Sequence, residues 1–259
     1  MQLSLQNWLF FILIFARVVS IISLAPVYGG RNLPAMSRIG FSALLSYLFY
    51  AVLPQPAVEL TNNFWLLLPG EVLVGLGIGY VTMLFFNAVQ MAGNLIDIPM
   101  GFTMVNVFDP NTDTQLPIMG NFYYVLAMLL FLVTNAHQML LAAMLESYQW
   151  FGLGHQITGS LLVSFGETFA AIFLIGVKIS IPVVGVMLMS DVALALLART
   201  VPSLNAFILG VPVKIALGVV AMLFCLSAFI AFSSDLFLNR ETGMVREIMD
   251  FLRLLGGGS

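Results

Sequence analysis

The sequence predicts an all-α membrane protein that contains several apolar helices, some of them kinked or broken into helical hairpins. Two observations lead to this fold class. Of the 259 residues, 61% are hydrophobic and only 8% are charged, whereas a soluble domain carries about 25% charged residues. The apolar residues also occur in long runs, and about 20 such residues allow a helix to cross a bilayer. The chain must therefore contact lipid, other apolar subunits, or both.

Six apolar segments are candidates for membrane helices. The second is short for a complete span, whereas the third and the fifth are long. Pro182 lies inside the fifth segment, which we expect to kink or break there because proline removes a helical hydrogen bond. Pro212 is one of several other prolines that we expect at segment ends or kinks. The six segments are Trp8–Leu24, Ile39–Leu53, Phe64–Val89, Met119–Leu145, Phe169–Leu197 and Ile208–Phe232.

The C-terminal stretch 244–255 has a different pattern. Its charged side chains alternate with apolar ones at helical spacing, which predicts a short amphipathic helix at a surface or an interface. Residues 256–259, Gly-Gly-Gly-Ser, are interpreted as a linker or a tag remnant.

The basic residues give contradictory topologies if all six segments cross the membrane. Arg31 and Arg38 place the first connection in the cytoplasm by the positive-inside rule. Six crossings would then put the C-terminal tail outside, although it carries Arg240, Arg246 and Arg253. Either at least one segment does not cross, or the helices belong to an assembly rather than to a simple bundle.

Seven ionic residues interrupt the apolar runs. A charge inside a membrane is costly unless it is paired or hydrated. These residues form either an ion or proton path or a set of salt bridges between helices or subunits. Both signs occur in similar numbers, which favours pairing. The seven are Arg17, Glu71, Asp97, Lys178, Asp191, Arg199 and Lys214.

Gly75 and Gly79 lie four residues apart in the run EVLVGLGIG, a spacing that is typical of close packing between membrane helices. The same spacing also occurs by chance in many apolar sequences. A dinucleotide-binding fingerprint is excluded, because no strand precedes the run and no acidic residue follows at the required distance.

The stretch 92–117, AGNLIDIPMGFTMVNVFDPNTDTQLP, separates two apolar segments. It is too rich in Gly, Pro, Asn and Asp for a tight turn and too apolar for a solvated loop. Long loops without secondary structure are usually functional or disordered, and disorder requires low hydrophobicity. We therefore expect the whole stretch to form an apolar loop, in which residues 100–117 either seal a channel or anchor a buried connection. Its large apolar side chains are Met100, Phe102, Met104, Val105, Val107 and Phe108.

Composition also argues against several functional classes. The net charge of −3 and the lack of a basic patch give no indication of a nucleic-acid partner. Cys225 is the only cysteine, and the two histidines have no carboxylate at ligand spacing, so we expect neither a metal nor another cofactor. No catalytic constellation has convincing spacing, and we expect no enzymatic activity.

Motifs occur in a characteristic order from about Leu5 to about Leu226. They are LAPVYGGRNLPAMSRIG, EVLVGLGIGY, AGNLIDIPMGF, the FDP of Phe108 to Pro110, NAHQMLLAAMLESY and ISIPVVGVMLMSDVALALLARTVPSLNAFILGVPVKI. In order and spacing they resemble the FliR family of the flagellar type III export gate. One departure is His137, which follows Asn-Ala where the family usually has Asn-Gly.

The resemblance implies a single domain over residues 1–255 that packs into a helical, channel-bearing hetero-oligomer. The implied partners are FliP-type and FliQ-type subunits, with FlhB-type and FlhA-type components, the lipid membrane and unfolded flagellar proteins as cargo. The implied location is the bacterial inner membrane at the flagellar basal body. Residues 100–117 would be the plug of the gate. Its implied residues are Met100, Phe102, Met104, Val105, Val107 and Phe108, followed by Asp109 and Pro110.

Two other functions stay open. The injectisome counterpart of the export gate has the same architecture, and the sequence separates the two systems poorly. An ion or small-molecule secondary transporter would suit kinked segments and intramembrane charges, but the chain shows no convincing internal repeat. A membrane-embedded enzyme fits least, because no catalytic constellation is present.

Overall fold

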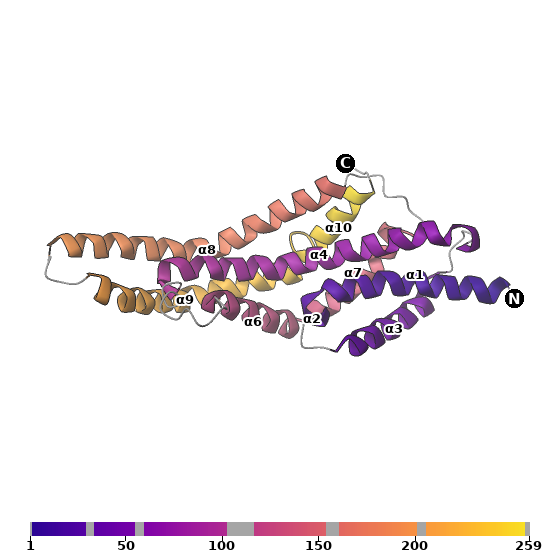
Figure 1. The fold of residues 1–259 in the computed structure, drawn as a ribbon, viewed down its shortest axis with the longest axis horizontal. Coiled ribbons are helices and arrows are strands. Elements are labelled where there is room, and N and C mark those ends of the chain that lie inside the picture. The colour runs from indigo at the N-terminus through magenta and orange to yellow at the C-terminus, as the bar shows by residue number, and fades with distance from the viewer. Residues whose placement is uncertain are drawn as a thin grey trace, which may run out of the picture. The chain divides into compact units, whose positions relative to one another are not determined.

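The computed structural model describes residues 2–29, 34–54, 60–102, 117–153, 161–200 and 206–256. These residues are almost entirely helical and form no strand, which confirms the predicted all-α fold (Figure 1). The helices are α1 (Gln2–Leu24), α2 (Pro26–Gly29), α3 (Ala35–Val52), α4 (Leu60–Met100), α6 (Ile118–Val133), α7 (Ala136–Trp150), α8 (Leu161–Thr200), α9 (Ala206–Leu238) and α10 (Met244–Leu255).

The chain divides into two compact units, each assembled from separate stretches of sequence. Unit 1 consists of Met1–Phe85, Asn135–Ala170 and Leu236–Ser259, and unit 2 consists of Phe86–Thr134 and Ala171–Asp235. Helices α4, α8 and α9 contribute residues to both units. The single domain over residues 1–255 therefore stays a prediction.

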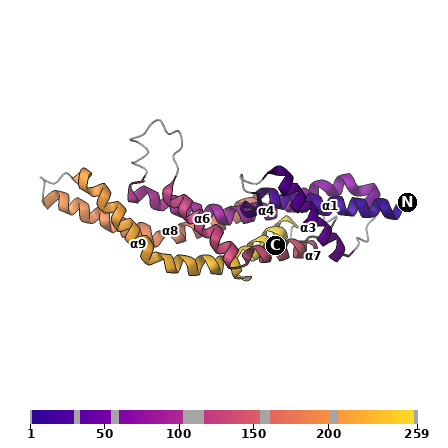
Figure 2. The same ribbon diagram turned by 90° about the horizontal axis from the view of Figure 1, so that it is seen from below.

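Unit 1 is built on the contact of α1 with α3 and with the first half of α4. Helices α1 and α3 pack against each other: α3 runs back along α1 in Figure 1 and crosses it obliquely in Figure 2. Gly75 and Gly79 of α4 face α1. A Cβ atom at Gly75 would lie 2.5 Å from the Arg17 carbonyl oxygen, and one at Gly79 would lie 2.8 Å from the Leu24 Cβ. The absence of side chains at these two positions lets the two helix backbones approach closely.

Unit 2 packs the end of α4 and helix α6 against α8 and α9. Phe86 of α4 meets Phe131 of α6 with ring centroids 5.3 Å apart, and Tyr123 of α6 meets Phe229 of α9 at 4.7 Å, both edge to face. Such aromatic pairs contribute about 0.5–1.5 kcal/mol beyond the area that they bury. Small residues again allow close approach, since a Cβ at Gly176 of α8 would meet the backbone of α4 at the Ala88 carbonyl.

Five described helices are long and apolar enough to cross a membrane: α1, α3, α4, α8 and α9. The bent pair α6 and α7 would add a sixth crossing if it is counted as one span. Five crossings put the connection that carries Arg38 and the tail that carries Arg240 on the same side of the membrane. The contradiction in the positive-inside rule then disappears, because α6 and α7 would enter and leave on one side.

Two sequence-based expectations differ from the structure. Residues 92–100 are part of α4 and not of a loop, because Gly93, Asn94 and Asp97 make contacts with α6 that are described below. Pro182 and Pro212 lie inside α8 and α9 and end neither helix, so the break expected at Pro182 does not occur, while the kink expected there stays a prediction. Membrane helices tolerate proline because neighbouring groups satisfy the carbonyl that proline leaves without a donor.

The predicted segment Met119–Leu145 is divided into α6 and α7 at Thr134 and Asn135. Asn135 has a left-handed backbone with φ of 60°. Asparagine tolerates this conformation better than most residues because its short polar side chain can bond locally. Hydropathy alone did not reveal this break, since apolar residues continue on both sides.

Helix α10 covers the range in which an amphipathic helix was predicted. Its apolar face is buried and packs on α7, and a Cβ at Gly77 of α4 would overlap the ring of Phe251. The exposed face carries an ion pair between Arg246 and Asp250 at 3.3 Å. Burial raises the pKa of the Glu247 carboxyl group, Asp250 raises it further and Arg246 opposes the shift.

We expect Gly75→Ala to lower the free energy of unfolding by about 1–3 kcal/mol, because the new methyl group overlaps the α1 backbone. Gly70→Ala is the matched control on the same helix, because a Cβ there meets no atom within 4 Å. That control should leave stability unchanged or raise it slightly, since alanine favours helix. Thermal unfolding in detergent measures both, and equal midpoints for the two variants would contradict the close α1–α4 contact.

Candidate functional site: the anchored ends of the central segment

The residues that the sequence assigns to a plug lie mainly outside the described structure. We call residues 103–116 the central segment. Met100 is the last residue of α4 and Phe102 follows the turn at Gly101, whereas the other predicted plug residues fall in the central segment. These others are Met104, Val105, Val107, Phe108, Asp109 and Pro110.

Asp97 joins the two ends of the central segment. Its carboxylate, on the last turns of α4, accepts hydrogen bonds from the backbone amides of Met119 at 3.0 Å and Gly120 at 3.3 Å. Helix α6 begins after Pro117, which provides no side-chain cap. The first amides of a helix lack intrahelical partners and attract negative charge. Asp97 therefore caps α6 from a neighbouring helix, and it is 2% exposed.

Close backbone contact between α4 and α6 adds to the hydrogen bonds of Asp97. A Cβ at Gly93 of α4 would lie 2.5 Å from the carbonyl oxygen of Met119, and a Cβ at Gly120 would collide with the Asn94 side chain. The end of α4 and the start of α6 therefore touch at one glycine of each helix. Gly93, Asn94 and Asp97 belong to a stretch that resembled a loop in sequence, but here they provide close approach and capping.

Met100 holds the end of α4 against α9. Its side chain is fully buried, and a Cβ at Gly218 would lie 2.6–2.9 Å from its side-chain atoms. The chain then turns at Gly101, whose φ of 84° favours glycine. Met100 thus belongs to the base from which the central segment leaves, since its side chain is packed inside unit 2.

A second polar cluster lies inside unit 1 and is centred on Arg17. The Arg17 guanidinium donates to Glu71 Oε2 at 2.6 Å, to Ser147 Oγ at 3.2 Å and to the Phe151 carbonyl at 3.0 Å. It also stacks 4.0 Å from the centre of the Tyr148 ring. Arg17 is 0% exposed. One side chain therefore joins α1, α4 and α7, and it binds a carbonyl at the C-terminal end of α7, where positive charge is favoured.

The remaining intramembrane charges behave differently from one another. Lys214 of α9 pairs with Asp191 of α8 at 2.5 Å. Arg199 lies in the last turn of α8, where a cation complements the helix dipole. Lys178 has no ion-pair partner among the described residues. The two pairs that involve Glu71 and Lys214 therefore form within the chain, not between subunits.

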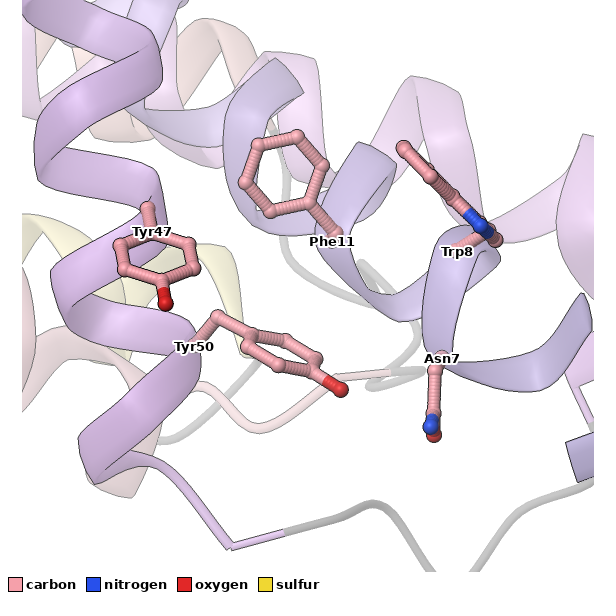
Figure 3. A pocket seen from close by; sticks show the side chains of 5 residues that line it. All are labelled: Asn7, Trp8, Phe11, Tyr47 and Tyr50. Atoms are coloured by element: carbon pink, nitrogen blue, oxygen red, sulfur yellow. The ribbon is translucent and has the colours of Figure 1, made fainter. Parts of the chain in front are cut away.

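An aromatic groove lies between α1 and α3 (Figure 3). It has a volume of about 380 Å³ and is lined by Asn7, Trp8 and Phe11 from α1 and by Tyr47 and Tyr50 from α3. Phe11 and Tyr50 meet nearly at right angles, with ring centroids 6.4 Å apart. Tryptophan and tyrosine are enriched at membrane–water interfaces, and both α1 and α3 are candidate spans.

Sequence reasoning missed the partners of the buried charges and this groove. Ser147 and Tyr148 lie just beyond the predicted segment Met119–Leu145, and only the fold brings them to Arg17. A signal was available for Asp97, because α6 begins at a proline with no capping residue nearby and needs an acceptor. Tyr47 and Tyr50, three residues apart on one helical face, were a signal for the groove.

The long apolar helices define a polytopic α-helical membrane protein. The family model of bacterial export proteins, family 1, matches residues 8–239. The chain belongs to this family, which confirms the resemblance inferred from its motifs.

Similar proteins of known name cover most of the chain. The flagellar biosynthetic protein FliR of Bacillus subtilis (strain 168) is 35% identical over 232 residues, which are 88% of this chain and 90% of that protein. The protein of the same name from Escherichia coli (strain K12) is 26% identical over 92% of this chain and 93% of its own length. That from Pectobacterium carotovorum subsp. carotovorum is 27% identical, with 90% and 91% covered.

We expect Asp97→Ala to speed hydrogen exchange at the amides of Met119 and Gly120 by about tenfold or more, because both lose a buried acceptor. Asp97→Asn keeps one acceptor oxygen and should have a smaller effect. Exchange followed by mass spectrometry measures this, with the Leu130 amide in the same helix as internal control. Unchanged exchange at residues 119 and 120 would show that Asp97 does not cap α6.

We expect Arg17→Met and Glu71→Leu each to lower the free energy of unfolding by about 3–5 kcal/mol, because each leaves a buried charge without its partner. The double variant should cost clearly less than the sum, since no charge is then left unpaired. Unfolding of all four proteins in one detergent measures the coupling. Strictly additive effects would mean that the two side chains do not stabilise each other.

Proposed function

We propose that this protein is a channel-forming subunit of the flagellar protein-export gate in the bacterial inner membrane, at the flagellar basal body. Unfolded flagellar proteins are the cargo, and the central segment is the plug. The observation that carries the proposal is the fixed base of that segment: Asp97 caps α6 and Met100 is buried against α9. Family membership and the names of the relatives support the export role.

A plug requires a segment that can be displaced while its ends stay in place. The base meets this requirement, because its contacts are two hydrogen bonds to buried amides and glycine-mediated helix packing. The central segment itself contains apolar side chains, among them Met104 and Phe108. Methionine adapts to varied shapes, which suits a seal that must close again after different cargo.

The apolar surface supports assembly with other apolar subunits. Large side chains such as Met189 of α8 and Phe224 of α9 are exposed, with Phe224 at 81%. Such surface must be covered by lipid or by protein. FliP-type and FliQ-type subunits are the proposed neighbours, with FlhB-type and FlhA-type components nearby. The flagellar names of the relatives favour this system over the injectisome.

A secondary transporter is supported less well. In unit 1 the Arg17 charge is neutralised by Glu71, and in unit 2 the Lys214 charge is neutralised by Asp191. A transport path needs charges that can exchange ions, whereas the buried Arg17–Glu71 pair is held by further hydrogen bonds to Ser147 and Phe151.

We expect Met104→Ala and Phe108→Ala to increase ion leak through the membrane severalfold, because each removes a large apolar side chain from the proposed seal. Met36→Ala, on the exposed surface of α3, is the matched methionine control and should leave conductance unchanged. Membrane-potential dyes in growing cells and motility in soft agar provide the two measurements. Wild-type conductance in both plug variants, with normal expression, would reject the plug.

A further inference from the structure

Lys178, an exposed residue of α8, lines a partly open cavity of about 270 Å³ in unit 2. Helices α6, α8 and α9 form its walls, and the lining includes Tyr123, Pro182, Cys225, Phe229 and Phe232. These walls are mainly apolar. The Lys178 ammonium is therefore the one full positive charge among the described residues that line this cavity.

The charge of Lys178 has no counter-ion within the described part of the chain. The carboxylates of unit 2 that the structure describes are used elsewhere: Asp97 binds the α6 amides, Asp191 pairs with Lys214, and Asp235 has a contact of its own. Pro182, one turn further on, has no backbone N–H to donate to the Lys178 carbonyl. That carbonyl is therefore a second polar group at this position of the helix. A lone charge in an apolar span is costly, so an anion from outside the chain would stabilise it.

The surface around Lys178 determines what kind of group can supply that anion. Leu174 and Ile181 lie on the same face of α8 as Lys178, one turn before and one turn after it, and are 56% and 57% exposed. Gly185 continues this face, and a Cβ there would meet no atom within 4 Å. Apolar side chains around one cation, followed by a small residue, fit an apolar helix that carries one carboxylate.

The position of Lys178 along α8 favours a protein carboxylate over a lipid phosphate. At 1.5 Å per residue, Lys178 lies about 16 Å from Glu167 and about 20 Å from Asp191, with only uncharged residues between. Lipid phosphates lie at the surfaces of a hydrocarbon layer about 30 Å thick. The middle of an uncharged stretch of this length is out of their reach when the helix spans the bilayer.

We propose that the Lys178 cavity receives an Asp or Glu side chain from an apolar helix of a neighbouring subunit in the assembly. This inference rests on the proposed function, because it requires that the chain is packed among other apolar subunits. The resulting intersubunit ion pair joins α8 of this chain to its neighbour and complements the Arg17–Glu71 and Lys214–Asp191 pairs, which form within the chain.

The test uses the complex isolated gently from native membranes through a tag on this chain. We compare the wild type with Lys178→Met, which keeps length but removes charge, and with Lys178→Arg, which keeps charge. Co-purified apolar subunits should fall about tenfold or more with Lys178→Met and persist with Lys178→Arg. Thermal unfolding of the isolated chains should be the same, which separates loss of assembly from loss of fold.

Cys225 supplies a local readout, because it lines the same cavity and is the only cysteine of the chain. Alkylation of Cys225 should be slow in the wild-type complex and about tenfold faster in the isolated chain and in Lys178→Met. A carbodiimide should also couple the Lys178 amine to the neighbouring carboxylate, and mass spectrometry of the linked peptides should identify a residue of another subunit.

The possible results separate failure of this inference from failure of the proposed function. Normal subunit recovery and unchanged Cys225 protection in Lys178→Met would overturn the inference while the proposed function stands. Loss of bound phospholipid alone, or coupling of Lys178 to a carboxylate of its own chain, would also overturn it. If the wild-type chain recovers no apolar subunits, the proposed function itself fails, and the inference fails with it.

Discussion

Unit 1 depends on the burial of Arg17. A guanidinium that is removed from water must have its donors satisfied and its charge neutralised, or the cost exceeds the gain from packing. Glu71, Ser147 and the Phe151 carbonyl meet this requirement from two other helices. The relative position of α1, α4 and α7 is thereby fixed, and Gly75 allows the close contact of α1 with α4 that brings Glu71 to Arg17.

Unit 2 has a related requirement at the start of α6, where buried backbone amides need hydrogen-bond acceptors. This helix begins after a proline without a local cap, so its free amides need an acceptor. Asp97 supplies it from α4, and Gly93 with Gly120 lets the two helices come close enough for the bonds to form. The helices on either side of the central segment are thereby held together by the Asp97 carboxylate and by close backbone contact.

Three of the four cations in the apolar runs illustrate three ways of carrying charge in a membrane protein. Arg17 is buried with its partner, and Lys214 forms a partly exposed pair inside its unit. Lys178 has neither arrangement among the described residues, which makes it the group that most needs a neighbour. Residues that looked equivalent in sequence therefore have separate structural roles.

The sequence by itself determined the class of protein and the positions of most helices. Hydropathy is a local property, so the long apolar runs predicted α1, α3, α8 and α9, and the motif order identified the family. Only the tertiary structure decided which charges pair, that α4 continues to Met100, and that the chain bends at Asn135. These features depend on groups far apart in sequence: Gly, Asn and Asp in 92–100 favour a loop locally, whereas contact with α6 makes them part of a helix.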